Sequence, residues 1–268
     1  MRLLRSAALR IALAVAPVAV GCHAGPPPGG ALEYSENARR AYDEALDAYF
    51  DRDWETAITL FQEVKRKYGY SRWARLADLR IADAEFRQQK YPEAISAYKA
   101  FVADYPNDAE VPYAKYRVAK ALFLESEPTL LLPPLEERDL GTVQDAYASL
   151  RAFLEGFPGY EHERELVYML EVVTGVLARH ELYVARFYRD RGQFPAALRR
   201  IEYCLQEFPG SGLDAEALVL LGETHLMMKQ PRRARRAFDR VLREHPESAF
   251  VLPARRYLAR MGAPPAGG

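Results

Sequence analysis

The sequence predicts an all-α protein, a solenoid of five helix-turn-helix repeats with a C-terminal capping helix. Two observations support this class: a small residue followed four positions later by a bulky one recurs five times, and a helix terminator stands eight positions after each bulky residue. A fixed repeat of this kind is typical of stacked helical repeats. The five pairs are Ala57 with Phe61, Ala94 with Tyr98, Ala146 with Leu150, Ala197 with Ile201, and Ala234 with Phe238. The five terminators are Gly69, Pro106, Pro158, Pro209 and Pro246.

Each part of the pattern has a physical reason. The small Ala lets two helices approach closely, and the residue four positions later lies on the same helix face. Pro92, Pro195 and Pro231 mark the first turns of second helices, where a missing N–H costs nothing. First helices upstream have apolar residues at three- and four-residue spacing, for example between Leu76 and Phe86. This is the tetratricopeptide (TPR) pattern of antiparallel helix pairs, and it predicts a TPR superhelix.

The spacing between the five Ala markers is uneven, at 37, 52, 51 and 37 residues. The first excess falls in 125–142, where three prolines predict a loop. The second falls in 161–191, which has no proline and predicts one helix of about 30 residues that links the two halves. Residues 248–261 predict a last amphipathic helix that covers the end of the stack, and 262–268 a disordered tail.

The N-terminus has the pattern of an export signal. Residues 1–21 combine a basic start with ten apolar residues, too few to cross a bilayer. The tetrapeptide Ala19-Val20-Gly21-Cys22 resembles a bacterial lipobox, which implies cleavage before Cys22 and its lipidation, and His23 after it implies sorting to the outer membrane. Residues 22–34 predict a Pro/Gly spacer, with 23–30 unable to form a helix.

The charge balance excludes a polyanion binder. The chain has 37 basic and 37 acidic residues, and without 1–21 it has 34 basic residues against 37 acidic ones. No nucleic-acid partner is therefore expected. The second cysteine, Cys204, lies in an apolar helical pattern and is predicted to pack as a small hydrophobic residue.

The motifs of an enzyme are missing from the sequence. The five histidines lack metal-ligand spacing, and His180-Glu181 lacks the second histidine of a zinc-peptidase motif because Val184 stands in its place. His225 falls at a repeat core position and is predicted to be a core histidine. We therefore expect no catalytic residues, no metal and no cofactor.

The predicted sites are surfaces. In a TPR array the first helices line a groove that binds extended peptides or partner domains. The repeat register places an aromatic set towards this groove, and the alternative is that the same residues pack between helices. The set is Tyr42, Tyr49, Leu79, Phe86, Tyr116, Lys120 and Phe123, accompanied by Leu46 and Asp83.

The order of these features resembles the BamD family of outer-membrane lipoproteins, subunits of the β-barrel assembly machine. The resemblance covers nearly the whole mature chain and is strongest in 90–98, 101–107, 113–116, 138–139 and 183–192. It implies a subunit without catalytic activity, lipid-anchored at the periplasmic face of the outer membrane. The implied partners are unfolded outer-membrane β-barrel proteins, bound by repeats one to three (35–159), and the periplasmic domains of BamA, bound by repeats four and five with the cap (160–261). By position, Arg200 matches a family arginine at the BamA-facing end.

Three alternatives stand beside this interpretation. The nearest is another cell-envelope TPR lipoprotein, of pilus assembly or of the Tol system, which would lack this insertion pattern or carry an N-terminal coiled coil. The second is a structural scaffold without a client. The third is an envelope hydrolase, which needs a nucleophile and a base that the sequence does not show.

Overall fold

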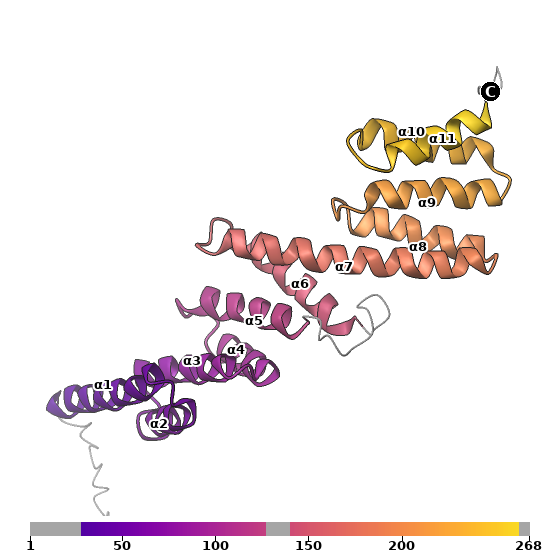
Figure 1. Cartoon of the computed structure of the whole chain (residues 1–268). Helices are drawn as coiled ribbons and strands as arrows, with labels where there is room; N and C mark the ends of the chain where they lie inside the picture. The colour runs from indigo at the N-terminus through magenta and orange to yellow at the C-terminus, as the bar shows by residue number, and fades with distance from the viewer. Residues whose placement is uncertain (1–27, 127–139, 263–268) are drawn as a thin grey trace, which may run out of the picture.

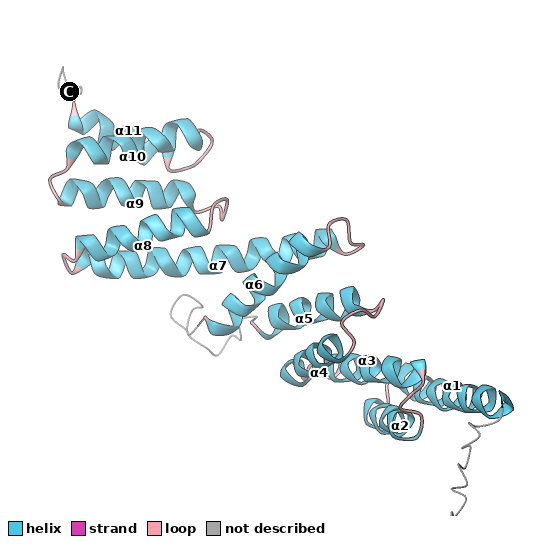
Figure 2. Ribbon diagram, turned by 180° about the vertical axis from the view of Figure 1, so that it is seen from behind, coloured by secondary structure: helices cyan, strands magenta, loops and turns pink. Residues whose placement is uncertain are grey.

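The computed structural model of the chain describes residues 28–126 and 140–262. Within these ranges the chain forms eleven helices and no strand, stacked into an elongated array with α1 at one end and α11 at the other (Figures 1 and 2). Successive helices pair as α1/α2, α3/α4, α5/α6, α7/α8 and α9/α10, so the predicted TPR superhelix is confirmed. The helices are α1 Pro28–Phe50, α2 Trp54–Lys67, α3 Arg72–Arg87, α4 Tyr91–Asp104, α5 Val111–Glu125, α6 Gly141–Gly156, α7 Glu163–Asp190, α8 Phe194–Glu207, α9 Asp214–Met227, α10 Pro231–Glu244 and α11 Val251–Met261.

The repeat markers lie where close packing requires them. Both members of all five pairs, from Ala57 with Phe61 to Ala234 with Phe238, have no solvent-accessible surface. The second helix of each pair ends two residues before its terminator, for example α4 at Asp104 before Pro106. A proline disfavours helical backbone at the residue before it. This explains the constant offset in the four repeats whose terminator is a proline.

The long helix α7 connects the two halves of the array. It runs from Glu163 to Asp190 without interruption, packs on α6 near its start and on α8 near its end, and confirms the predicted 30-residue helix (Figure 1). The last helix, α11, packs on α10 and α9 and covers the final pair, as expected of a cap.

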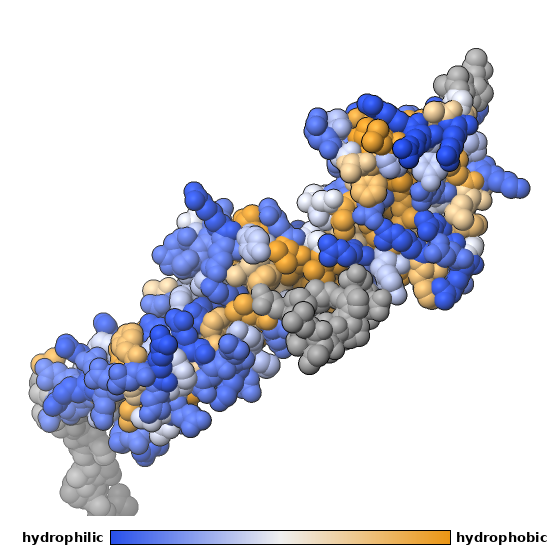
Figure 3. All heavy atoms as spheres, in the orientation of Figure 1, coloured by the Kyte–Doolittle hydropathy of each residue, from blue (hydrophilic) through white to orange (hydrophobic). Residues whose placement is uncertain are grey.

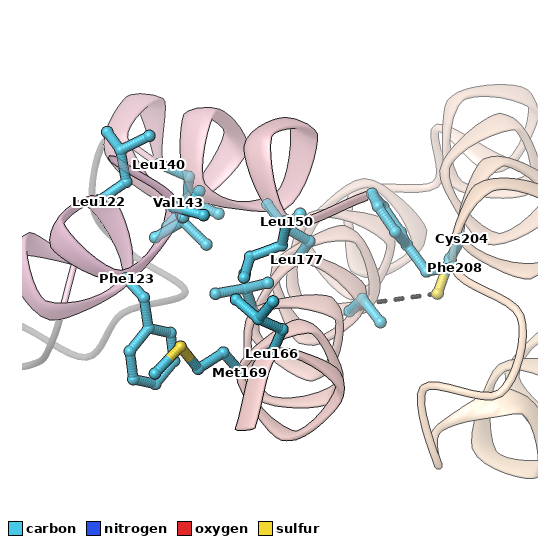
Figure 4. Close-up of a cluster of buried hydrophobic side chains, with 14 of the residues drawn as sticks. Leu122, Phe123, Leu140, Val143, Leu150, Leu166, Met169, Leu177, Cys204 and Phe208 are labelled. Carbon is cyan, nitrogen blue, oxygen red and sulfur yellow. Dashed lines mark hydrogen bonds between the residues drawn. The ribbon is translucent and has the colours of Figure 1, made fainter. Parts of the chain in front are cut away.

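A continuous apolar core joins these helices. Figure 4 shows Leu122 and Phe123 of α5 and Val143 and Leu150 of α6 facing Leu166, Met169 and Leu177 of α7. In the same view the buried thiol of Cys204 on α8 points towards α7, and it donates a hydrogen bond of 3.6 Å to the carbonyl oxygen of Ala178. On the surface, apolar side chains gather over the middle of the stack, where α5, α6 and α7 meet (Figure 3).

One predicted boundary is wrong. We expected residues 23–30 to be unable to form a helix and the spacer to reach residue 34, but α1 begins at Pro28. Proline is tolerated in a first helical turn because the N–H that it lacks has no partner there. Its position therefore starts the helix instead of preventing it.

The other predictions about the termini fall outside the described residues. These are the export signal 1–21, Cys22 and most of the spacer, the tail after Gly262, and the predicted loop within 127–139. Among the described helices, none is both long enough and apolar enough to cross a membrane.

Candidate partner-binding surfaces

The predicted groove residues lie on the first helices α1, α3 and α5, but they divide into two groups. Tyr42, Leu79, Tyr116 and Phe123 are at most 8% exposed and belong to the packed core between helices. Tyr49, Phe86 and Lys120 keep part of their side chains at the surface. The register prediction could not separate these groups because core and groove positions alternate within one turn of a helix. Only the side chains of the second group are therefore accessible from outside the array.

Asp83 on α3 organises the centre of this surface. Its carboxylate is 1% exposed and accepts hydrogen bonds from the hydroxyls of Tyr98 (2.5 Å) and Tyr113 (2.7 Å) and from Arg80 Nη1. Burial, followed by the nearby Asp83 charge, raises the pKa of both tyrosines well above the ordinary value, so both stay protonated as donors. The carboxylate thus ties α3 to α4 and α5.

A second guanidinium, that of Arg117 on α5, lies close to the same carboxylate. Its Nη2 is 3.8 Å from Asp83 Oδ1, and its Cζ lies 3.8 Å from the ring centroid of Phe86. An arginine at this distance over an aromatic ring is attracted to the negative π face. Arg80 and Arg117 together carry two positive charges against one on Asp83. These three charged groups beneath Phe86 therefore sum to one net positive charge.

Tyr49 marks the neighbouring part of the surface. Its ring packs edge-on against Trp54 with ring centroids 5.1 Å apart. Both rings line an open cavity of about 580 Å³, together with Phe50, Arg52 and Arg87. This combination of aromatic rings and arginines is typical of protein–protein contact points.

At the other end of the surface, Lys120 is held in place by an acid from the next repeat. Its Nζ lies 2.6 Å from Glu165 Oε1 on α7, and the Tyr116 hydroxyl donates a hydrogen bond of 2.8 Å to Glu165 Oε2. Burial alone would raise the pKa of Glu165, but hydrogen bonds from Lys120 and Tyr116 outweigh it and lower that pKa. Lys120 therefore links α5 to α7 within the molecule, and part of its side chain lies at the surface.

Arg200, the predicted BamA contact, lies on α8 with its side chain 44% exposed. Its Nη1 donates to both carboxylate oxygens of Glu181 on α7, at 3.1 and 3.3 Å. Next to it, Tyr188, Ala196, Arg199 and Tyr203 line a shallow cavity of about 310 Å³. Arg200 thus has a structural role, and its role towards a partner stays a prediction.

The sequence interpretation missed three residues that shape these surfaces, namely Arg80, Arg117 and Glu165. A signal existed for Arg117, a charged residue within the apolar run of α5 that is 9% exposed in the structure. A charge in such a position needs a partner, which could have led to Asp83. Arg80 and Glu165 gave no comparable signal.

The residues considered for chemistry lie in structural positions. Burial raises the pKa of the Cys204 thiol to about 12, far from the range of a reactive thiolate. His225 is buried and its Nδ1 lies 3.1 Å from Gln230 Oε1, and burial lowers its pKa. No group of three potential metal ligands occurs among residues 28–126 and 140–262.

Comparison with known families identifies the array. A family described as "YfiO: Outer membrane lipoprotein" matches residues 35–241, which span α1 to α10 and include both candidate surfaces. The chain belongs to the YfiO family. The match covers the predicted groove residues and Arg200, and it ends before the capping helix α11.

Several curated relatives carry one name, outer membrane protein assembly factor BamD. The protein of Caulobacter vibrioides is 27% identical over 98% of this chain and 84% of its own length. The protein of Xylella fastidiosa strain 9a5c is 26% identical over 81% and 76%, and that of Neisseria gonorrhoeae 23% identical over 81% and 83%. Among solved structures, the P58(IPK) TPR domain matches with a TM-score of 0.43 and 16% identity, covering 85% of this chain and 57% of that one. This YfiO-family chain is therefore related to outer-membrane assembly factors over most of its length.

Proposed function

We propose that the chain is a non-catalytic subunit of the β-barrel assembly machine, which holds the periplasmic domains of BamA and receives unfolded outer-membrane proteins. The observation that carries this proposal is the YfiO-family match across the repeat array, together with relatives named as outer-membrane assembly factors. A TPR array suits the role because it offers long surfaces for other chains and needs no bond chemistry.

The client-binding surface is formed by Tyr49, Phe86 and Lys120, on α1, α3 and α5. Strands of outer-membrane barrels alternate apolar and polar residues and carry aromatic girdles. Partly exposed aromatic rings above a cationic centre can contact the apolar residues of such a strand and the carboxylates near it. Tyr42, Leu79, Tyr116 and Phe123 support this surface from within the core.

The BamA-binding surface lies in the second half, around Arg200. Tyr188, Arg199 and Tyr203 line the cavity beside Arg200, and Tyr203 is 47% exposed. Tyrosine and arginine dominate the energetic centres of protein interfaces, so this cluster is suited to a stable partner. Two separate surfaces in the two halves allow both partners to bind at once.

The anchor is the lipid on Cys22, and it places the array at the periplasmic face of the outer membrane. Three acyl chains, as in a mature bacterial lipoprotein, hold a protein firmly where one chain binds reversibly. Replacing Cys22 by Ala is expected to move the protein from the membrane fraction to the soluble fraction. A Cys22→Ala protein that stays in the membrane would show that lipidation is not the anchor.

Purification from the native outer membrane in mild detergent tests the proposed function. We expect BamA to co-purify with the wild-type chain. Recovery of pilus-assembly or Tol components without BamA would instead support the alternative, a different cell-envelope TPR lipoprotein.

A further inference from the structure

A pocket on the second-helix side of repeats two and three is not used by either proposed surface. It has a volume of about 510 Å³ and lies between α4 and α6, which both pack on α5. Its lining is mainly apolar and includes Val102, Val118, Ala152, Phe153 and Phe157. A volume of this size is typical of sites that bury several apolar groups of a ligand.

Two lysines lie at this pocket, and neither has an acidic partner within the described residues. Lys99 on α4 and Lys115 on α5 both line it and are both exposed. Among the described residues, no carboxylate lies within ion-pair distance of either Nζ, which is also true of Lys90 and Lys229, whereas Lys65, Lys67 and Lys120 have such partners. The Lys115 Nζ lies 5.3 Å from the ring centroid of Phe157, which keeps it at the apolar wall. The pocket therefore combines an apolar interior with two uncompensated positive charges.

We propose that this pocket is a binding site for an acidic peptide segment of another protein, which inserts a large apolar side chain and places neighbouring carboxylates at Lys99 and Lys115. Charge complementarity selects the acidic partner, and the apolar walls select the side chain that enters. The site lies on α4 to α6, away from Tyr49, Phe86 and Arg200. It does not depend on the proposed assembly role, because it is carried by this geometry alone.

The chain provides variants that test the pocket without removing its core. Ala152 is exposed, so Ala152→Trp fills the pocket from its rim. Lys99→Glu combined with Lys115→Glu reverses both charges at exposed positions. Lys229→Glu is the matched control, an exposed lysine in the turn between α9 and α10. Circular dichroism and the thermal midpoint check that each variant is folded.

The probe is a fluorescein-labelled peptide of alternating phenylalanine and glutamate, blocked at both ends, titrated by fluorescence anisotropy with the mature chain. We expect Ala152→Trp and the double lysine variant each to weaken binding about tenfold or more, because each removes one group of contacts with the peptide. We expect Lys229→Glu to leave the affinity unchanged. A peptide with lysine in place of glutamate should not bind.

Three results would overturn the proposal. The first is equal affinity of wild type and the double lysine variant for the acidic peptide. The second is loss of binding in Phe86→Ala but not in Ala152→Trp, which would place the labelled peptide on the client-binding surface of Tyr49, Phe86 and Lys120. The third is binding to phosphatidylglycerol vesicles that depends on Lys99 and Lys115 while the peptide does not bind, which would assign the lysines to a lipid surface.

Discussion

Arg200 Nη1 lies 3.1 Å from Oε2 and 3.3 Å from Oε1 of Glu181, so a single guanidinium nitrogen joins both oxygens of a carboxylate that is 8% exposed. The pair connects α7 to α8 within the fourth repeat. Any substitution of Arg200 consequently acts on the fold of this repeat as well as on the proposed partner surface. The two effects need separate variants.

Arg200→Ala should lower the free energy of unfolding by about 1–2 kcal/mol, because it leaves the buried Glu181 carboxylate unpaired while Arg200 itself is well solvated. Urea unfolding measures this loss. A double-mutant cycle with Glu181→Ala should show the two side chains to be coupled.

Glu181→Gln separates the partner role from the structural one, since it keeps the side chain and leaves the Arg200 charge in place. If Arg200 contacts BamA directly, Glu181→Gln should retain BamA in co-purification, and Arg200→Glu should lose it. Equal losses in both variants would mean that the pair acts only through the fold.

Gly222→Ala should destabilise the fifth repeat. A Cβ at this position would overlap the Phe238 ring, which is fully buried and stacked on Tyr257 with centroids 4.8 Å apart. Overpacking of this kind costs about 1–3 kcal/mol, more than alanine contributes to helix propensity. Thermal unfolding should show a lower midpoint. Gly156→Ala is the control, because a Cβ there meets no atom within 4 Å and stability should change by less than about 1 kcal/mol.

The sequence was sufficient to predict the repeats because each marker carries a local physical constraint. Ala146 and Leu150 had to be buried for two helices to meet, and both are fully buried. Prolines fixed the helix starts at α4, α8 and α10. The same proline rule misplaced the start of α1, since proline in a first turn and proline in a spacer look alike in sequence.

The details of the candidate surfaces could not be predicted in the same way. Asp83 meets Tyr98 and Tyr113 across 15 and 30 residues of sequence, and no local pattern encodes that meeting. Periodicity placed Leu79 and Phe86 on one predicted surface, although Leu79 is fully buried and Phe86 is not. A helix face is wider than one row of side chains, so the boundary between core and groove depends on how neighbouring helices pack.

Asp83→Asn should cost about 3 kcal/mol or more, because it removes the negative charge that faces Arg80 and Arg117 in a nearly buried cluster. Tyr113→Phe removes only one hydrogen bond to the same carboxylate and should cost about 1 kcal/mol. Denaturant midpoints compare the two variants with wild type. Equal effects would show that the charge of Asp83 contributes nothing beyond its hydrogen bonds.

The contact of Glu165 with Lys120 and Tyr116 should depend on pH. The folded pKa of Glu165 lies below its ordinary value of 4.5, so the link stabilises the protein fully above that value and is lost as the pH falls through the lower folded pKa. Glu165→Gln removes the carboxylate charge, and with it the ion pair, at every pH. The difference in urea midpoint between wild type and Glu165→Gln should therefore be present at about pH 7 and shrink below about pH 4.5. A difference that grows on acidification would contradict a stabilising role for the ionised Glu165.

The most direct test of the proposed recognition is a titration of the mature chain against a labelled, unfolded outer-membrane β-barrel segment. Phe123→Ala is unsuitable for it, because Phe123 is 8% exposed and its loss would destabilise the core. The variant is Tyr49→Ala with Phe86→Ala, and the control is Tyr70→Ala, a fully exposed tyrosine outside the surface. We predict a loss of affinity of about tenfold or more for the double variant and no change for the control. Unchanged affinity in a folded Tyr49→Ala, Phe86→Ala protein would contradict the assignment of the client surface.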